Sequence, residues 1–208
     1  IGLFLNAEGD TFHGNTVFKS HHFLVGASFQ NAAFLGKVDF LDCTFVSGTS
    51  FEGARFEGGV NFFNSRFNTD VSFVDSKFIR GKDIISGLPG VRFSSGEFLG
   101  VCSFKRAVFD FVRSEHQNAN PNVIFEQIKF VKGVDFCQTD FKKSRVSFYE
   151  ARFGISSNFE CAGFGDGMEF SSSIVQNFRD IIGSLNGERV FIGNAGNIFY
   201  NMESLGGT

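Results

Sequence analysis

The sequence predicts an all-β solenoid, in which very short strands wind around one axis and stack in successive coils. Three observations predict this fold. The chain of 208 residues contains 32 Phe but only 2 Tyr and no Trp. The Phe residues recur at alternating steps of six and five residues, and a small residue precedes nearly every one of them by two positions. Such a bias means that one structural position is filled repeatedly by one side chain, as in repeat proteins.

The phenylalanine rhythm extends over most of the chain. From Phe12 to Phe78 the steps alternate between six and five residues without error, and the rhythm resumes three times. Around a helix of 3.6 residues per turn, successive Phe residues would lie about 140° and 120° apart, so no apolar stripe would form. The register comprises 26 of the 32 Phe: Phe12, Phe18, Phe23, Phe29, Phe34, Phe40, Phe45, Phe51, Phe56, Phe62, Phe67, Phe73, Phe78, Phe93, Phe98, Phe104, Phe109, Phe125, Phe130, Phe136, Phe141, Phe148, Phe153, Phe159, Phe164 and Phe170.

A second constrained position lies two residues before each of these Phe residues. Of its 26 occupants, 23 are Ala, Ser, Thr, Val, Cys, Gly or Ile, as at Ala54 and Val60. Because side chains alternate with a period of two along a strand, the small residue and the Phe point to the same side, and the residue between them points away. Each unit is therefore a short strand with one apolar face, which only stacking on other units can bury.

The six-residue steps predict a sharp corner. Gly, Asn and Asp tolerate positive φ, so we expect the corner at the third residue after the Phe that opens each step. These positions are Asn15, Gly26, Gly48, Gly59, Asp70, Gly81, Gly133 and Gly167.

Units such as Ala54-Arg55-Phe56, joined in pairs across residues 60–70 and 71–81, resemble the pentapeptide-repeat family in its Phe-rich variety with eleven-residue double units. The resemblance covers residues 7–175. It implies a right-handed quadrilateral parallel β-helix with one unit per side and the Phe rings along the centre. With 22 residues in each coil, two more than is usual in the family, about eight coils would form a rod roughly 35–40 Å long.

Two domains are expected. The β-helix takes residues 1–175, with irregular breaks at 79–92 and 110–124 that each contain one of the two prolines. Residues 176–208 are expected to form a short C-terminal helical cap and tail, because Phe178, Ile181, Ile182 and Leu185 follow helical spacing and residues 195–205 suggest a second helix. The helical segment would cover the end of the solenoid or make a homodimer contact.

Composition gives no support for nucleic-acid or membrane binding. The net charge is −3, although residues 76–152 carry an excess of five positive charges. The four cysteines form no CxxC pair, and no signal peptide or membrane span is apparent, so a cytoplasmic protein with reduced thiols is expected. The absence of Met at position 1 suggests a processed chain or a fragment.

The sequence predicts no catalytic, cofactor-binding or metal site. The adjacent residues His21 and His22 diverge on a strand and would not converge on a metal. Candidate partner-binding residues lie in the second break and in a possible basic patch at the middle of the rod. They are Arg113, Glu115, His116, Gln117, Lys105, Arg106, Lys142 and Lys143.

These observations favour a non-enzymatic scaffold that presents flat faces to a protein partner. Two alternatives remain open. Some members of the family mimic DNA and protect type II topoisomerases, but the positive middle third of this chain fits that role poorly. A polysaccharide lyase or hydrolase on a larger right-handed β-helix would need a long groove with clustered acids or bases.

Overall fold

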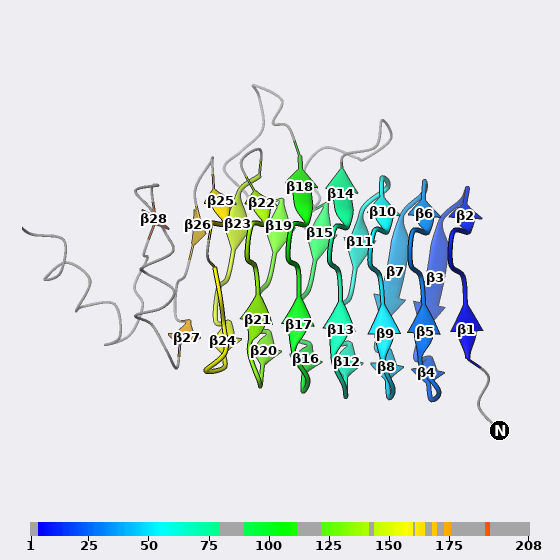
Figure 1. Cartoon of the computed structure of the whole chain (residues 1–208), viewed down its shortest axis with the longest axis horizontal. Coiled ribbons are helices and arrows are strands. Elements are labelled where there is room, and N and C mark those ends of the chain that lie inside the picture. Colours follow the sequence, from blue (N-terminus) through cyan, green and yellow to red (C-terminus); the bar gives the residue numbers. More distant parts are fainter. Residues whose placement is uncertain are drawn as a thin grey trace, which may run out of the picture.

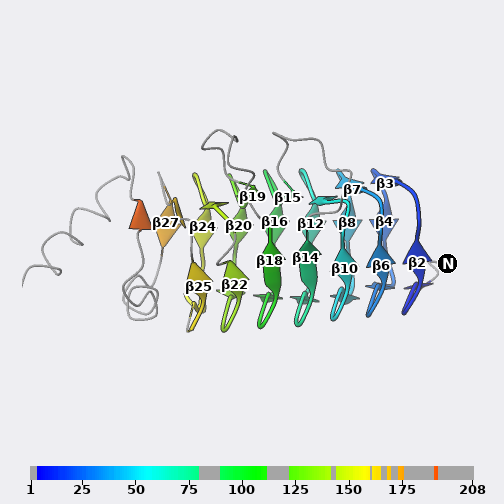
Figure 2. The same cartoon turned by 90° about the horizontal axis from the view of Figure 1, so that it is seen from above.

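The computed structural model describes residues 4–79, 90–111, 122–141, 144–159, 161–164, 168–169, 173–175 and 190–191. In these residues, short strands form four parallel sheets that wind as a right-handed, four-sided β-helix (Figure 1). A quarter turn of the view shows the same stacked coils from above (Figure 2). The predicted all-β solenoid is confirmed.

Each sheet forms one side of the rod, and from β1 to β24 successive strands belong to sheets A, B, C and D in a fixed order. Sheet A contains β1 (Leu5–Asn6), β5 (Ala27–Ser28), β9 (Thr49–Ser50), β13 (Val71–Ser72), β17 (Cys102–Ser103) and β21 (Val134–Asp135). Sheet B contains β2 (Thr11–Phe12), β6 (Ala33–Phe34), β10 (Arg55–Phe56), β14 (Lys77–Ile79), β18 (Val108–Asp110), β22 (Asp140–Phe141) and β25 (Gly163–Phe164).

Sheets C and D complete the four sides. Sheet C contains β3 (Thr16–Lys19), β7 (Val38–Leu41), β11 (Val60–Asn61), β15 (Val91–Arg92), β19 (Val123–Ile124), β23 (Val146–Ser147), β26 (Met168–Glu169) and β28 (Val190–Phe191). Sheet D contains β4 (His22–Phe23), β8 (Thr44–Phe45), β12 (Arg66–Phe67), β16 (Glu97–Phe98), β20 (Lys129–Phe130), β24 (Arg152–Phe153) and β27 (Ile174–Val175).

Phenylalanine rings fill the interior in four ladders, one for each side. Phe34, Phe56 and Phe78, for example, are register partners in consecutive strands of sheet B, 22 residues apart. Ring centroids of consecutive Phe residues within the ladders lie between 4.4 and 5.7 Å apart. Every described Phe of the predicted register from Phe23 to Phe164 is buried, so the rhythm of six and five residues is confirmed as the core.

The small residues beside the Phe ladders are buried as predicted, and the hydroxyl groups among them are satisfied. Ser65 Oγ donates to the carbonyl oxygen of Phe40 at 2.9 Å and accepts a hydrogen bond from the Cys43 N–H at 3.1 Å. Ser76 Oγ donates to the carbonyl oxygen of Phe73 at 2.7 Å. Hydroxyls at this position therefore tie neighbouring backbone segments together instead of leaving unpaired polar atoms in the core.

The corners differ in part from the prediction. Gly26, Gly59 and Gly133 have the expected positive φ, but Asn15, Gly48 and Asp70 do not; Gly81 and Gly167 lie outside the described residues. The regular left-handed position is instead the second residue after each Phe that opens a five-residue step. Its occupants are Ser20, Asn31, Asp42, Gly53, Asn64, Asp75, Ser95, Arg106, Gln127, Gln138, Glu150 and Cys161.

The short connection in the five-residue step explains why its second residue after the Phe adopts a positive φ. Only Gln30 and Asn31 separate Phe29 from the next small residue, Ala32, whose N–H donates to the Phe29 carbonyl oxygen at 3.1 Å. A four-residue turn closed in this way, with positive φ at its third residue, is a type II turn. The six-residue step has one more residue and turns without a fixed left-handed position.

The two predicted breaks leave the stack of coils intact. Ile79, residues 91–92, Asp110 and residues 123–124 belong to strands, so the interruptions are shorter than expected. The Phe ladders continue across both of them, since the rings of Phe62 and Phe93 are 4.7 Å apart and those of Phe93 and Phe125 are 5.2 Å apart. Both excursions are therefore insertions into coils whose register is otherwise preserved.

The predicted helices at 178–185 and 195–205 lie outside the described residues, as does a homodimer contact through them. Within 176–208 the structure describes residues 190–191, which form β28 and extend sheet C from β26. At residues 190–191, within the segment expected to form the helical cap, sheet C therefore continues.

Replacing Phe56 by Ala is expected to lower the free energy of unfolding by about 3–5 kcal/mol, because a large cavity would open inside a closed coil. Phe56 is fully buried, with its ring 5.1 Å from that of Phe34 and 4.9 Å from that of Phe78. Denaturant unfolding measures the change. Phe63→Ala is the control, since Phe63 is 38% exposed and should cost much less; equal losses in the two variants would contradict the ladder.

Gly58→Ala is expected to lower the free energy of unfolding by about 1–3 kcal/mol through overpacking. A Cβ at Gly58 would lie 2.1 Å from the backbone carbonyl carbon of Gly36 in the preceding coil. Gly14 occupies the same place in the first described coil, and a Cβ there meets nothing within 4 Å. Gly14→Ala should therefore be tolerated, and thermal melting of both variants tests the contrast.

Candidate interaction surface

Sheet A presents a row of four serines to the outside of the rod. Ser28, Ser50, Ser72 and Ser103 each precede an in-register Phe, and they are register partners in consecutive strands. Each hydroxyl oxygen accepts a hydrogen bond from the backbone N–H two residues later, as from Val74 to Ser72 at 3.3 Å. This bond fixes the oxygen and leaves the hydroxyl proton for an acceptor outside the coil.

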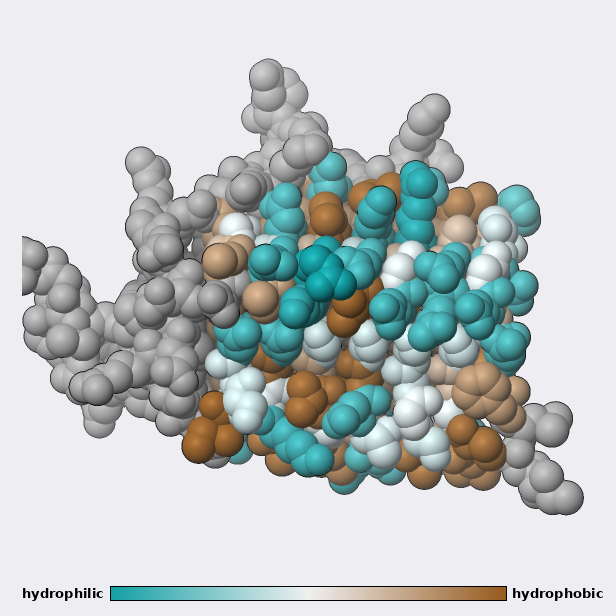
Figure 3. All heavy atoms as spheres, in the orientation of Figure 1, coloured by the Kyte–Doolittle hydropathy of each residue, from teal (hydrophilic) through white to brown (hydrophobic). Residues whose placement is uncertain are grey.

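The serine row forms the floor of a shallow open groove of about 500 Å³. Phe4, Asp70 and Val101 are among the residues that line it, and the side chain of Phe4 is 51% exposed. In the space-filling view, residues of intermediate hydropathy follow this side of the rod, with hydrophobic residues along its lower edge (Figure 3). The groove therefore combines hydrogen-bond donors with an apolar border.

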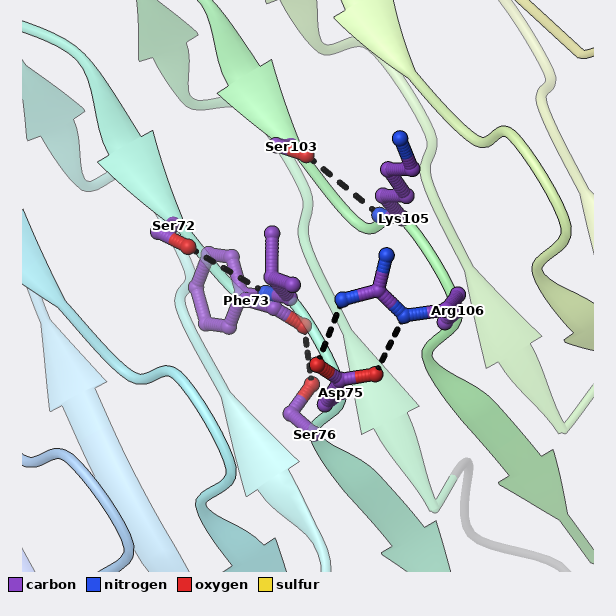
Figure 4. Close-up of polar contacts among 8 residues, drawn as sticks. Ser72, Phe73, Asp75, Ser76, Ser103, Lys105 and Arg106 are labelled. Carbon is purple, nitrogen blue, oxygen red and sulfur yellow. Dashed lines mark hydrogen bonds and ion pairs between the residues drawn. The ribbon is translucent and has the colours of Figure 1, made fainter.

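An ion pair stands at the edge of this face toward sheet B. Asp75 and Arg106 occupy the left-handed turn position in consecutive coils, and Nε and Nη2 of Arg106 each donate to a carboxylate oxygen of Asp75 at 2.7 Å (Figure 4). The hydrogen bonds from Arg106 lower the pKa of Asp75, and the same bonds raise the pKa of Arg106. Two parallel charge-assisted bonds hold both side chains in place.

The predicted partner-binding residues are only partly described. Lys105 lies half-buried on the sheet A side, beside Ser103, and the charge of Arg106 is matched by Asp75. The predicted basic patch thus contains one cation that already has a carboxylate partner. The other candidates, Arg113, Glu115, His116, Gln117, Lys142 and Lys143, lie outside the described residues.

The serine row was not predicted, although the sequence carries a signal for it. Ser28, Ser50 and Ser72 follow one another at intervals of 22 residues, the length of one coil. The outward position of every fourth unit therefore defines one face. Ser103 does not follow Ser72 at the same interval of 22 residues, because the first insertion lies between them.

The histidines and cysteines that the structure describes do not form one site. His21 is exposed, and its Nδ1 lies 2.9 Å from the carbonyl oxygen of Lys19. Among the described residues, no three His, Cys, Asp or Glu side chains are placed to hold a metal ion. All four cysteines are free thiols, and burial raises the pKa of Cys43 and Cys102.

No protein-family model matches the chain, and no curated protein matches it significantly. Among solved structures, the chain is similar to a trypsin-treated variant of QnrB1, which is described as a plasmid-mediated fluoroquinolone resistance protein. The two are 15% identical, the alignment covers 94% of this chain and 98% of that chain, and the TM-score is 0.20. A likeness at this TM-score supports no conclusion about this chain.

Within the described part of the chain, no helix is long and apolar enough to span a membrane.

The Asp75–Arg106 pair predicts a defined pH dependence of stability. The pKa of Asp75 is lower in the folded chain than its ordinary value of 3.8, so its stabilising contribution is fully present above that pH and is lost as the pH falls through the folded pKa. Near neutral pH the wild-type protein should have a higher melting temperature than the Asp75→Asn variant. The difference between the two melting temperatures should shrink in acid. Arg106→Gln should abolish this acid-dependent difference. An equal difference at all pH values would contradict the pairing.

Proposed function

We propose that the chain is a pentapeptide-repeat protein that acts as a non-enzymatic binding module for a protein partner. The groove over the serine row carries this proposal, because it offers fixed hydrogen-bond donors beside apolar side chains on a rigid floor. The four free thiols favour a reducing compartment, which fits a cytoplasmic location.

The dimensions of the groove suit a short extended peptide segment. Four serines in consecutive coils span three coil intervals, or about 14 Å, which an extended chain covers with about four residues. Main-chain carbonyl oxygens of such a segment would accept hydrogen bonds from the serine hydroxyls, and an apolar side chain of the partner would pack against Phe4 or Val101. Little ordering is required of the module itself, because its backbone is already held by ladder hydrogen bonds.

The two other functions gain no support from this surface. A polysaccharide-cleaving site usually works with a pair of carboxylates, whereas the described lining of the groove includes one, Asp70, whose Oδ1 accepts a hydrogen bond from the Val101 N–H at 2.8 Å. A DNA mimic needs continuous acidic surface, and the outward row of sheet D includes Arg66, Lys129 and Arg152.

The proposal predicts that Ser72→Arg will weaken partner binding, because a long charged side chain would fill the middle of the groove. Asn61→Arg is the matched control: Asn61 is an outward strand residue of sheet C whose side chain also accepts a hydrogen bond from the N–H two residues later. A protein captured from lysate by the wild type should be identified, purified and titrated against all three proteins.

Binding by the wild type and Asn61→Arg, with affinity reduced about tenfold or more in Ser72→Arg, is the expected result. Circular dichroism should show that both variants keep the fold. Equal affinity in the three proteins would refute the assignment of the groove.

A further inference from the structure

The outward side of sheet D carries a row of mostly charged side chains, in which cations predominate. From β4 to β24, its outward positions, one from each strand, are register partners from coil to coil. In chain order they are His22, Thr44, Arg66, Glu97, Lys129 and Arg152. Three of the last four residues are cations, so positive charge accumulates toward the later coils.

The positive charge of this row is only partly neutralised. Glu97 is shared, with its Oε2 2.8 Å from Nη1 of Arg66 and its Oε1 3.7 Å from Nζ of Lys129. Arg152 follows Lys129 in the next strand, and Lys132 is exposed in the turn after β20. Within the described part of the chain, neither Arg152 nor Lys132 forms an ion pair. The unneutralised charge therefore lies over β20 and β24.

Exposed apolar side chains lie among these cations. Val131 is 50% exposed and comes directly after β20, and Ile155 is 67% exposed and comes two residues after β24, in the next coil. Gly154 lies over the Val131 backbone so closely that a Cβ would approach its carbonyl oxygen to 2.3 Å. Gly154 itself has no side chain that could cover Val131, which is half-exposed. We call Lys129, Val131, Lys132, Arg152 and Ile155 the β20–β24 patch.

Acidic residues on the adjoining faces limit the width of the patch. Glu126 and Glu150 follow the two strands of sheet C that precede β20 and β24, and Asp135 is the outward residue of β21 on sheet A. A broad polyanion, such as a duplex or an anionic bilayer, would approach these carboxylates as well as the cations. A single narrow chain would meet only the cations and the two apolar side chains.

We propose that the β20–β24 patch binds an acidic segment of a protein that carries apolar residues among its carboxylates. Lys129, Lys132 and Arg152 provide the charge complementarity, and Val131 and Ile155 provide the apolar contact. This surface lies on a different side of the rod from the serine groove and does not depend on the function proposed for that groove.

The test uses the full chain and a fluorescent peptide of alternating Glu and Leu, with binding followed by anisotropy. The wild type should bind this peptide with an affinity that falls as salt is added, and should bind more weakly a peptide with Gln in place of Glu. The double variant Lys129→Glu with Arg152→Glu should lose about tenfold or more in affinity. Ile155→Ser should weaken binding several-fold while leaving the salt dependence unchanged.

The control is the double variant Arg55→Glu with Lys77→Glu. These two residues are exposed cations and register partners in sheet B, so the variant makes the same change of charge on another face. It should retain peptide affinity to within about twofold. Duplex DNA and phosphatidylserine vesicles complete the set of probes. Unchanged peptide binding by the sheet D variant, an equal loss in the control, or binding of DNA or vesicles in preference to the peptide would each overturn the proposal.

Discussion

The stacking of one phenylalanine ring on another at the height of a single coil is the constraint on which this structure depends. Parallel strands of neighbouring coils lie at a fixed spacing, and the rings of Phe45 and Phe67, at 4.4 Å, fill that spacing almost completely. Rings from different sides also meet edge to face, as Phe51 and Phe62 do at 5.5 Å. Because each ring of an inner coil contacts rings above, below and across, a coil that lost its register would disturb four ladders at once. The core therefore fixes the backbone far more firmly than strands of two residues could by themselves.

Because the backbone is held in this way, a simple rule says which residues lie on the surface and which of them are neighbours. The residue before each Phe points outward, and residues one coil apart lie side by side. The serine row of sheet A and the cationic row of sheet D both follow from this rule, although their members are far apart in the sequence. The two rows differ in chemistry because outward positions are not constrained by packing, whereas core positions such as Phe56 and Ala54 are. The two candidate surfaces therefore occupy those positions in the repeat that are free to vary without loss of the fold.

The core could be predicted from the sequence because the requirement for it recurs in every unit. The Phe positions, the small residues such as Cys43 and Ser65, and the 22-residue coil all follow from periodicity. The left-handed turn residues could not be predicted in the same way. Asn31 and Asp42 suit positive φ, but Arg106 and Glu150 adopt it as well, because the hydrogen bond that closes each of these two turns and the ring beside it outweigh the local preference. The surfaces were missed for another reason. Ser103 and Lys129 enter their rows only after the lengths of the two insertions are known.

The insertions have a common location. Residues 80–90 connect β14 to β15 and residues 111–122 connect β18 to β19, so both connections join sheet B to sheet C, in consecutive coils. The one-residue lengthening between Phe141 and Phe148 falls at this edge too. Length variation is thus concentrated along a single seam, and the other three edges keep constant connections up to Phe164. For protein engineering, this seam is the natural place to graft foreign loops, which would then project in a row from one side of a stiff support.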